Sequence, residues 1–403
     1  MTTAQRRIVV VGGGLGGLRT VESLRRLGYD GELVLVSDER VAPYDRPPLS
    51  KRLLDREHLS QAPFLRAPDS YGDVCELVLG RRAVALDTEG RAVVLDDGTR
   101  QPYTAAVLAT GTRPNRLALL ADRSYTLRDY DDAVRLRRAI DGHARLAIVG
   151  AGFMGCEIAS AAAAAGVPVT LIEAAPTPLF GAVGGAVGGH VRDLHLADGV
   201  DVRCGTAVND VRADGAGHHL VLSDDRTVDA AVVAVCIGVR PAVDWLRDSG
   251  LVVDDGIVCD ARGETSAPDV YAVGDAAAWR YPGAEAPVRV EHWTTTGAQA
   301  VTVARNILAP RDERQPLDPL HYFWSDQCRT KLQCFGLPRP GDEVEVAVGA
   351  DGRALLAAYG DGRRATAVLG IGRPKQVLSL RTRLAAGASF GEIAGAVREL
   401  AAA

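Results

Sequence analysis

Residues 8–11 (IVVV) lead directly into residues 12–17 (GGGLGG), and this junction indicates how the N-terminal part of the chain folds. The apolar periodicity that follows predicts a helix to Leu27, and residues 32–36 (ELVLV) predict a second strand, which completes a compact βαβ unit. In such units three glycines allow a tight turn, a close approach of backbone N–H groups to a pyrophosphate, and close packing of the helix on the sheet. These three places are taken by Gly12, Gly14 and Gly17.

A second copy of this pattern begins near residue 146. Residues 146–149 (LAIV) precede the glycine segment 150–155 (GAGFMG), an alanine-rich helix is predicted to Ala165, and residues 169–172 predict the next strand. One such glycine segment is a weak signal, because many glycine-rich turns bind no ligand. Two copies about 140 residues apart predict two separate dinucleotide sites. The glycines of the second copy are Gly150, Gly152 and Gly155.

An acidic residue ends the second strand of each copy, where it can accept hydrogen bonds from an adenosine ribose. In the first copy this residue is Asp38, and its neighbour Glu39 is an alternative that the sequence does not separate from it. In the second copy it is Glu173, which is followed by two alanines and has no arginine nearby to hold a 2′-phosphate. Because a carboxylate repels that phosphate, the second site is predicted to prefer NADH.

Two further segments indicate that the first site holds FAD. One is Ala109-Thr110-Gly111, where the chain is expected to pass between domains, and the other is the strand end that carries Gly274 and Asp275. A Gly-Asp pair is usually only a turn. Here it follows two dinucleotide units, and an aspartate at this place can hydrogen-bond the ribityl chain of the flavin.

Composition excludes some classes of function. The chain has 403 residues, of which 47% are hydrophobic and 24% charged, as is typical of a globular protein of two or three domains. A net charge of −5 and a pI near 5.9 argue against nucleic acid as a main partner. No run of eighteen apolar residues is present, so we expect no membrane span and a cytoplasmic protein.

Cysteine and lysine usage are both informative. The seven cysteines have no metal-ligand or C-x-x-C spacing, which favours a reducing compartment, buried thiols and no metal site. Of the 46 basic residues only three are lysines, namely Lys51, Lys331 and Lys375. We interpret the lysines at positions 331 and 375 as retained by chance. We interpret Lys51 as functional because of the segment around it.

Residues 43–51 (PYDRPPLSK) are the most specific segment of the chain. Together with the two glycine segments, residues 273–275 (VGD), residues 291–293 (EHW) and residues 323–327 (FWSDQ), they closely resemble the FAD-dependent ferredoxin reductases of oxygenase systems. That family includes the putidaredoxin, rubredoxin and biphenyl-dioxygenase ferredoxin reductases, and the resemblance extends over essentially the whole chain.

The resemblance implies a glutathione-reductase-like fold of the α/β class, with two Rossmann-like dinucleotide-binding domains for FAD and NAD and a C-terminal α+β interface domain. We expect an FAD-binding domain in two parts (1–114 and 239–315), an NAD-binding domain (115–238) and the C-terminal domain (316–403). In the last domain the sequence predicts strands over residues 336–348 and 354–359 and a final helix over residues 390–400.

The resemblance also implies roles for individual residues. Lys51 and Glu157 are the implied catalytic residues, paired beside the nicotinamide, and Trp324 is implied to pack near the flavin on the side of the partner. Implied FAD contacts are Gly16, Asp38, Lys51, Arg128, Asp275 and Trp293. The remaining residues expected at the two cofactors are Leu15, Arg46, Ala83, Val84, Glu291, His292, Phe153, Met154 and Gly238.

Two segments depart from the family pattern. Residues 294–296 are Thr-Thr-Thr where relatives usually have Thr-Asn-Ala, a change that bears on hydrogen bonding at the isoalloxazine end. Residues 181–189 (GAVGGAVGG) are unusually rich in glycine, and we interpret them as a relaxed surface loop or a mobile segment.

Disulfide reductases of the same fold carry a C-x-x-x-x-C motif after the first βαβ unit, and this chain has Pro-Pro-Leu-Ser-Lys in that region. No dithiol can receive the hydride equivalent, so the reduced flavin is expected to pass electrons to an outside acceptor. We expect a small acidic [2Fe–2S] ferredoxin that supplies a P450 or Rieske-type oxygenase. From residue 317 onward eleven basic residues face nine acidic ones, a net charge of +2, so the expected docking face lies on the C-terminal domain.

Two alternatives remain open at this point. One is a diaphorase or monodehydroascorbate-reductase-like enzyme that reduces quinones or small radicals. The other is a flavin-binding signalling protein of the apoptosis-inducing-factor type. The sequence does not decide between a monomer and a homodimer.

Overall fold

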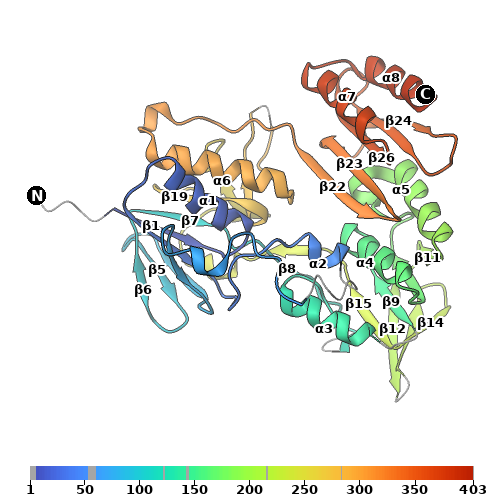
Figure 1. Cartoon of the computed structure of the whole chain (residues 1–403), viewed down its shortest axis with the longest axis horizontal. Coiled ribbons are helices and arrows are strands. Elements are labelled where there is room, and N and C mark those ends of the chain that lie inside the picture. Colours follow the sequence, from blue (N-terminus) through green and yellow to red (C-terminus); the bar gives the residue numbers. More distant parts are fainter. Residues whose placement is uncertain are drawn as a thin grey trace, which may run out of the picture. The chain divides into compact units, whose positions relative to one another are not determined.

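The structure is a computed structural model, and it describes residues 6–52, 60–120, 123–141, 145–214, 217–282 and 284–402. The chain divides into two compact units, each assembled from separated stretches of sequence (Figure 1). Unit 1 comprises Met1–Asp45, Ala62–Arg113 and Val239–Pro319, and unit 2 comprises Arg46–Gln61, Pro114–Gly238 and Leu320–Ala403.

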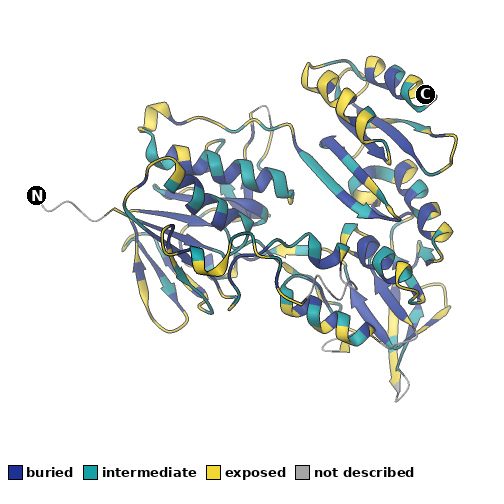
Figure 2. Cartoon of the chain, viewed as in Figure 1, coloured by how far each residue is buried: buried dark blue, intermediate teal, exposed yellow. Residues whose placement is uncertain are grey.

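A five-stranded parallel sheet in the order β19-β7-β1-β2-β3 forms the centre of unit 1. Val11 at the end of β1 lies opposite Val36 of β2 and Leu108 of β7. Strands β1, β2, β7 and β19 are apolar and almost entirely buried (dark blue in Figure 2), as expected for a parallel sheet covered on both faces, and the edge strand β3 is partly exposed. The elements are β1 (Arg7–Val11), α1 (Leu15–Arg26), β2 (Glu32–Val36), β3 (Glu76–Val78), β7 (Ala105–Leu108), β19 (Val270–Ala272) and α6 (Trp293–Leu308).

Unit 1 also contains smaller sheets that carry its loops. One is antiparallel, in the order β4-β5-β6, and another has the order β17-β18-β20-β21. Their strands are β4 (Ala83–Asp87), β5 (Ala92–Leu95), β6 (Arg100–Pro102), β17 (Val253–Asp254), β18 (Gly256–Cys259), β20 (Ala277–Trp279) and β21 (Val288–Arg289). The short connecting elements are β8 (Thr112–Pro114), β16 (Val239–Pro241), η1 (Pro68–Ser70), η3 (Asp244–Leu246), η4 (Gly274–Ala276) and η5 (Arg311–Glu313).

A second parallel sheet, β11-β10-β9-β15, lies in unit 2 and repeats the arrangement of the first. Val149 of β9 lies opposite Ile172 of β10, as Val11 lies opposite Val36 in unit 1. The predicted internal repeat of the sequence is therefore a repeat of structure. The elements are α2 (Pro48–Lys51), α3 (Tyr130–Ile140), β9 (Leu146–Val149), α4 (Phe153–Ala164), β10 (Val169–Glu173), α5 (Phe180–Ala197), β11 (Asp201–Cys204) and β15 (Val232–Val235).

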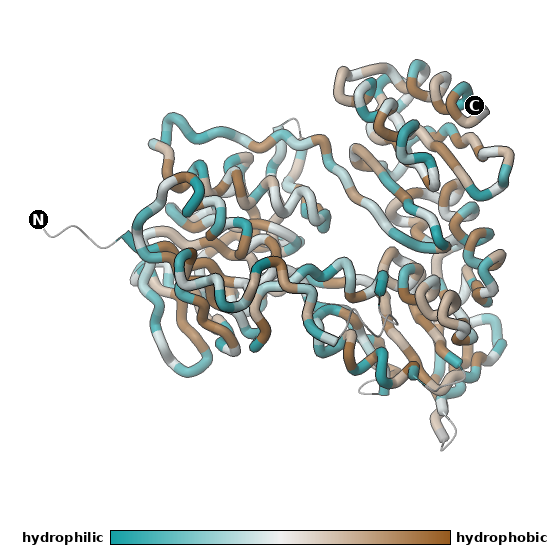
Figure 3. The backbone as a smooth tube through the Cα atoms, in the orientation of Figure 1, coloured by the Kyte–Doolittle hydropathy of each residue, from teal (hydrophilic) through white to brown (hydrophobic). Residues whose placement is uncertain are grey.

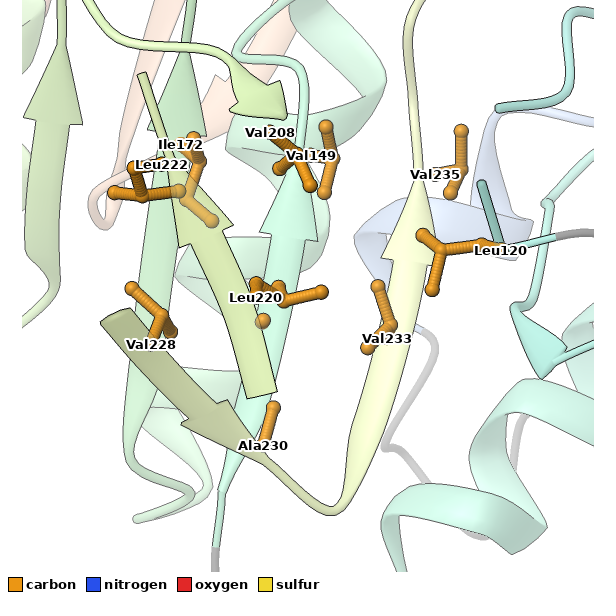
Figure 4. Packing of buried hydrophobic residues seen from close by; sticks show 11 residues of the cluster. Leu120, Val149, Ile172, Val208, Leu220, Leu222, Val228, Ala230, Val233 and Val235 are labelled. Carbon is orange, nitrogen blue, oxygen red and sulfur yellow. The ribbon is translucent and has the colours of Figure 1, made fainter. Parts of the chain in front are cut away.

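A three-stranded antiparallel sheet packs against this parallel sheet. It consists of β12 (Val208–Asp214), β13 (Gly217–Leu222) and β14 (Thr227–Ala230). Leu220 and Val228 of this sheet share one buried cluster with Val149 and Val233 of the parallel sheet (Figure 4). Burial of such side chains contributes about 1.5–3 kcal/mol each, so the cluster fixes β9, whose end leads into the second glycine segment.

The C-terminal part of unit 2 is a five-stranded antiparallel sheet, β22-β23-β26-β25-β24, with two helices. Helices α7 and α8 cover it through a core that includes Val377, Leu380 and Ile393. The bounds are β22 (Tyr322–Gln327), β23 (Thr330–Gly336), β24 (Glu343–Val348), β25 (Leu355–Gly360), β26 (Ala365–Ile371), α7 (Pro374–Ala385) and α8 (Phe390–Ala402).

Two expectations from the sequence are wrong. The continuous strand expected over residues 336–348 is interrupted between β23 and β24, because Pro338 and Pro340 have no N–H to donate to a ladder. The glycine-rich residues 181–189 are not a loop but lie within α5, which has a non-helical kink at Gly184. Packing requires a glycine at position 188, since a Cβ added to Gly188 would lie 2.3 Å from Pro178 O.

Hydrophobic residues are concentrated along the strands of the parallel sheets, and hydrophilic ones along the connecting turns (Figure 3). Within the described ranges, no helix combines the length and the apolar character that crossing a membrane requires.

Candidate active site

The first glycine segment forms a cradle at the N-terminus of α1. A Cβ added to Gly12 would lie 2.1 Å from Ala109 O, and one added to Gly17 would lie 2.0 Å from Gly12 O, so both positions exclude a side chain. Gly14 differs, because apart from its own chain neighbours no described residue has an atom within 4 Å of the position that a Cβ would take there. Gly14 is also the N-cap of α1, and among the described residues it makes no side-chain capping bond. The free N–H groups and open space fit the pyrophosphate of a dinucleotide.

The second glycine segment has the same construction at the N-terminus of α4. Added Cβ atoms would lie 2.4 Å from Cys236 O at Gly150 and 2.0 Å from Gly150 O at Gly155. Gly152, the N-cap, again has no described atom within 4 Å of its Cβ place and no side-chain cap in the described structure. Both cradles therefore fit a dinucleotide, each for the reason that its glycine spacing predicts.

The acidic residues of the two copies are arranged differently. Glu173 is the last residue of β10, and its carboxylate accepts hydrogen bonds from the N–H groups of Ala151 (2.6 Å) and Ala175 (2.8 Å). The equivalent register position in unit 1 is Ser37, so Asp38 lies one residue further along and is exposed. Glu39 accepts a hydrogen bond from Tyr44 Oη (2.5 Å). The structure leaves both Asp38 and Glu39 as candidates for the ribose.

The segment with Gly274 and Asp275 forms the short helix η4 after β19. Gly274 has φ +73°, a value that favours glycine, and its N–H donates to Gln299 Oε1 (2.7 Å). Gln299 is fully buried and donates in turn to Tyr281 Oη (2.9 Å). A side chain from α6 thus fixes the turn that presents Asp275, and sequence reasoning missed it because a single glutamine carries no motif.

The Thr-Thr-Thr departure lies in the first turn of α6. Thr296 Cγ2 would lie 3.2 Å from a Cβ added to either Gly16 or Gly274, so its methyl group packs on both glycines. This contact connects the first glycine segment with the Gly-Asp turn. Thr295 and Thr296 are both buried.

The other predicted residues of unit 1 lie on short connecting segments. Thr110 Oγ1 donates to Ala242 O (2.9 Å), and Gly111 has φ +66°. A bulge in β4 lies between Ala83 and Ala85, with Ala83 buried and Val84 exposed. Trp293 Nε1 donates to Asp45 Oδ1 (2.8 Å), which joins the start of α6 to the PYDRPPLSK segment. Leu15 begins α1, Ala109 follows β7, His292 is the N-cap of α6, and Glu291 pairs with Arg289.

Lys51 and Glu157 form an ion pair within unit 2. Lys51 Nζ lies 2.7 Å from Glu157 Oε1, and the two side chains are only 16% and 6% exposed. Lys51 ends α2, which begins with Pro48, and Glu157 lies on α4, which begins at the second glycine cradle. Ser50 Oγ also donates a hydrogen bond to Glu157 Oε2, and Ser325 Oγ donates one to Glu157 Oε1. Each of these bonds has a length of 2.5 Å. The predicted pair is present, and its place beside a nicotinamide stays a prediction.

Trp324 lies in β22 close to this pair. Lys51 Nζ is 6.0 Å from the centre of its ring, and Lys331 Nζ is also 6.0 Å from it. Two of the three lysines of the chain therefore lie near one tryptophan, a contact that the interpretation of Lys331 as retained by chance did not anticipate. The scarcity of lysine was the signal that could have found Lys331.

The other predicted residues of unit 2 surround the second cradle or α2. Arg46 donates to Arg128 O (2.6 Å), and Arg128 N donates to Asp132 Oδ2 (3.0 Å) at the start of α3. Phe153 packs edge-on against Phe323 of β22, with 5.1 Å between ring centres. Met154 is partly exposed at 36%, and Gly238 has φ +89°.

The cysteines form no disulfide in the structure. All seven are free thiols in the structure. Burial raises the pKa of Cys75 and Cys204 to about 11 and that of Cys236 and Cys328 to about 12, so these thiols stay protonated at neutral pH. Within the described ranges, no cluster of His, Cys, Asp and Glu side chains could hold a metal ion.

Comparison with known proteins agrees with this architecture. Residues 6–300 match the family described as pyridine nucleotide-disulphide oxidoreductase, and residues 322–396 match the reductase C-terminal family. The chain therefore belongs to the pyridine nucleotide-disulphide oxidoreductases. It is an oxidoreductase that uses FAD and NAD(H), and it has the mixed α/β fold of the FAD- and NAD-dependent reductases with an additional reductase C-terminal domain.

Individual relatives place the chain within this family. It is 34% identical to the ferredoxin–NAD(+) reductase subunit of a benzene 1,2-dioxygenase system from Pseudomonas putida, over 94% of this chain and 92% of the relative. It is 33% identical to putidaredoxin reductase of Pseudomonas putida, over 92% of this chain and 90% of the relative. The solved covalent complex of putidaredoxin reductase with putidaredoxin is similar with a TM-score of 0.89 and 30% identity, covering 98% of this chain and 99% of that one. The family that the PYDRPPLSK and FWSDQ segments indicated is confirmed.

Proposed function

We propose that this protein oxidises NADH and delivers the electrons, through FAD, one at a time to a small [2Fe–2S] ferredoxin that supplies a P450 or Rieske-type oxygenase. Each NADH would then reduce two ferredoxins and release one proton. FAD, when bound, accepts the two electrons of a hydride together and releases them singly. The residues of the chain bind the two dinucleotides, orient them and hold the charges around them.

The observation that carries this proposal is the structure of the PYDRPPLSK segment. In the region where a disulfide reductase has its dithiol, this chain has α2, and Lys51 of α2 is paired with the buried Glu157. All seven cysteines are free thiols and the PYDRPPLSK segment contains none, so the dithiol of a disulfide reductase is missing from this region. An outside acceptor is therefore required, and the relatives are named as components of ferredoxin-dependent dioxygenase and P450-type systems.

The preference for NADH rests on Glu173. Its two carboxylate oxygens are held by backbone N–H groups at the edge of the second cradle, so the negative charge is fixed at the end of β10. The 2′-phosphate of NADPH would meet that charge at close range. Asp275 on the turn fixed by Gln299 is proposed to hold the ribityl chain of FAD.

A cytoplasmic location is proposed on the basis of the seven free thiols, since oxidising compartments favour disulfides.

The test is a steady-state comparison of electron acceptors with purified protein and NADH. We expect kcat/KM for a [2Fe–2S] ferredoxin of an oxygenase system to exceed that for quinones by at least about tenfold, with ferricyanide as an acceptor that needs no docking. Higher kcat/KM with quinones would instead identify a diaphorase. Slow flavin reduction with a long-lived charge-transfer absorbance would identify a flavin-binding signalling protein.

A further inference from the structure

A chain of buried hydrogen bonds leads away from Glu157. Beyond Ser325, whose hydroxyl contacts the carboxylate, Gln327 Nε2 lies 3.2 Å from Ser325 Oγ. Gln327 Oε1 lies 3.0 Å from His195 Nε2. Ser325 and His195 are fully buried, and Gln327 is 5% exposed. The three residues come from β22 and from the last turn of α5, and they end on a carboxylate of α4.

The direction of every bond in this chain follows from the charge of Glu157. An ionised carboxylate only accepts, so the single hydroxyl hydrogen of Ser325 points to Glu157. Ser325 Oγ must then accept from Gln327, which requires the amide nitrogen of Gln327 to face it. The amide oxygen consequently faces His195, and Nε2 of His195 carries the hydrogen. All the hydrogen bonds are donated toward Glu157.

His195 suits this role because it is neutral. Burial lowers the pKa of His195, against an opposing contribution from its bond to Gln327. Its Nδ1 is buried and has no hydrogen-bond partner in the described part of the chain. A second proton on Nδ1 would be buried without an acceptor, which is costly. The ring is therefore held as the tautomer with hydrogen on Nε2, which is the one that can donate to Gln327.

We propose that Ser325, Gln327 and His195 are positioning residues, which hold the Glu157 carboxylate directed at Lys51. The inference rests on the proposed function, because it takes the Lys51–Glu157 pair to act in hydride transfer. Bonds to a charged acceptor are about twice as strong as neutral ones, and donors that point the same way polarise one another. Because β22 also carries Trp324, the strand that holds Glu157 in place is the one whose tryptophan lies against Lys51.

The variants that test this differ in hydrogen-bond direction rather than in size. Ser325→Ala removes the donor to Glu157. Gln327→Glu is nearly isosteric, but the introduced carboxylate takes the Ser325 hydrogen for itself and so reverses that bond. Gln327→Met removes the amide yet leaves the Ser325 hydrogen free to point to Glu157. Ser160→Ala is the matched control, because Ser160 lies on the same helix as Glu157 and accepts a bond from Cys328 N (2.7 Å) at the end of β22 without touching the pair.

The readout uses the scarcity of lysine. Acetic anhydride acetylates a lysine amine that has lost its proton and left its ion pair, and with only three lysines the rate at Lys51 can be measured by mass spectrometry against Lys331 and Lys375. In the FAD-loaded protein at fixed pH, we expect Ser325→Ala and Gln327→Glu to raise the relative acetylation of Lys51 several-fold. Gln327→Met should raise it less than twofold, and Ser160→Ala should leave it unchanged.

Stopped-flow reduction of the flavin by NADH provides the second measurement. We expect Ser325→Ala and Gln327→Glu to slow it about tenfold, which corresponds to about 1.4 kcal/mol, with the dissociation constant of NADH unchanged. Lys51 acetylation equal in Ser325→Ala and Ser160→Ala would overturn the positioning role. So would a larger effect of Gln327→Met than of Gln327→Glu, since that order indicates packing. Raised acetylation with unaltered flavin reduction would keep the positioning of Lys51 and reject its part in hydride transfer.

Discussion

Replacing Lys51 by methionine tests the ion pair most directly, because methionine keeps much of the volume of the side chain and removes its charge. At 2.7 Å and an effective dielectric constant of about 20, the attraction between the two charges is about 6 kcal/mol. Desolvation of both ions opposes part of this, and breaking a buried pair by removing one partner costs about 3–5 kcal/mol. Glu157 keeps the bonds from Ser50 and Ser325, so we expect Lys51→Met to lower the free energy of unfolding by about 3 kcal/mol.

Lys331→Met is the matched control for this experiment. Lys331 lies at the same 6.0 Å from the Trp324 ring, but its salt bridge to Asp326 (3.2 Å) joins side chains that are 49% and 38% exposed. We expect a loss below about 1 kcal/mol for this exposed pair. Urea unfolding of the FAD-loaded proteins gives the free energies, and stopped-flow reduction by NADH gives the rate, which should fall in Lys51→Met. Equal small losses in both variants, with an unaltered rate of flavin reduction, would refute a functional buried pair.

The remaining predictions concern the cofactors, the thiols and the partner. Asp275→Ala should weaken FAD retention by about 1.5–3 kcal/mol through loss of a charged acceptor, and equally tight retention, measured by fluorescence of released FAD, would reject the Asp275 assignment. With Glu173 intact, kcat/KM should favour NADH over NADPH by more than about a hundredfold, since several kcal/mol of repulsion correspond to that factor. Glu173→Ala should reduce this preference. Equal use of both nucleotides by the unaltered protein would contradict the role of Glu173. Because burial raises the pKa of cysteines such as Cys75 to about 11, 5,5′-dithiobis(2-nitrobenzoate) at pH 8 should react with native protein far more slowly than with denatured protein and leave NADH oxidation intact. The rate of ferredoxin reduction should fall steeply between 0.1 M and 1 M salt, because the Debye length shrinks from about 10 Å to about 3 Å. The rate of ferricyanide reduction should change little. An unchanged ferredoxin rate after charge reversal at Arg363, Arg364 and Arg373 together would count against the C-terminal docking face.

Local rules made the dinucleotide cradles predictable. Gly12 and Gly150 both have positive φ, and their neighbours exclude a side chain, so the residue type follows from backbone geometry alone. The parallel strands were equally predictable, because a strand buried on both faces needs an uninterrupted apolar run. Where spacing and periodicity carry the information, the sequence suffices.

The glycine-rich helix shows where local rules fail. Residues 181–189 have low helix propensity, yet they lie within α5. The cost of glycine in a helix is outweighed by tertiary packing, since Val183 and Val187 are buried and Gly188 lies against the 177–178 segment. Propensity describes an isolated segment, and it yields when burial stabilises the helix by more.

Glycine spacing and the family resemblance were enough to predict the two dinucleotide units, the family and the pairing of Lys51 with Glu157. The residues that hold this pair became visible only in the folded chain. Ser50, Ser325 and Gln327 lie within the PYDRPPLSK and FWSDQ segments, but those segments do not show what the side chains contact, and His195 lies in neither. The four residues come together because α2, α4, α5 and β22 meet in one buried place. A buried charge must be satisfied by whatever donors the packing brings to it. Those donors are set by three-dimensional proximity, which no local pattern of residues encodes.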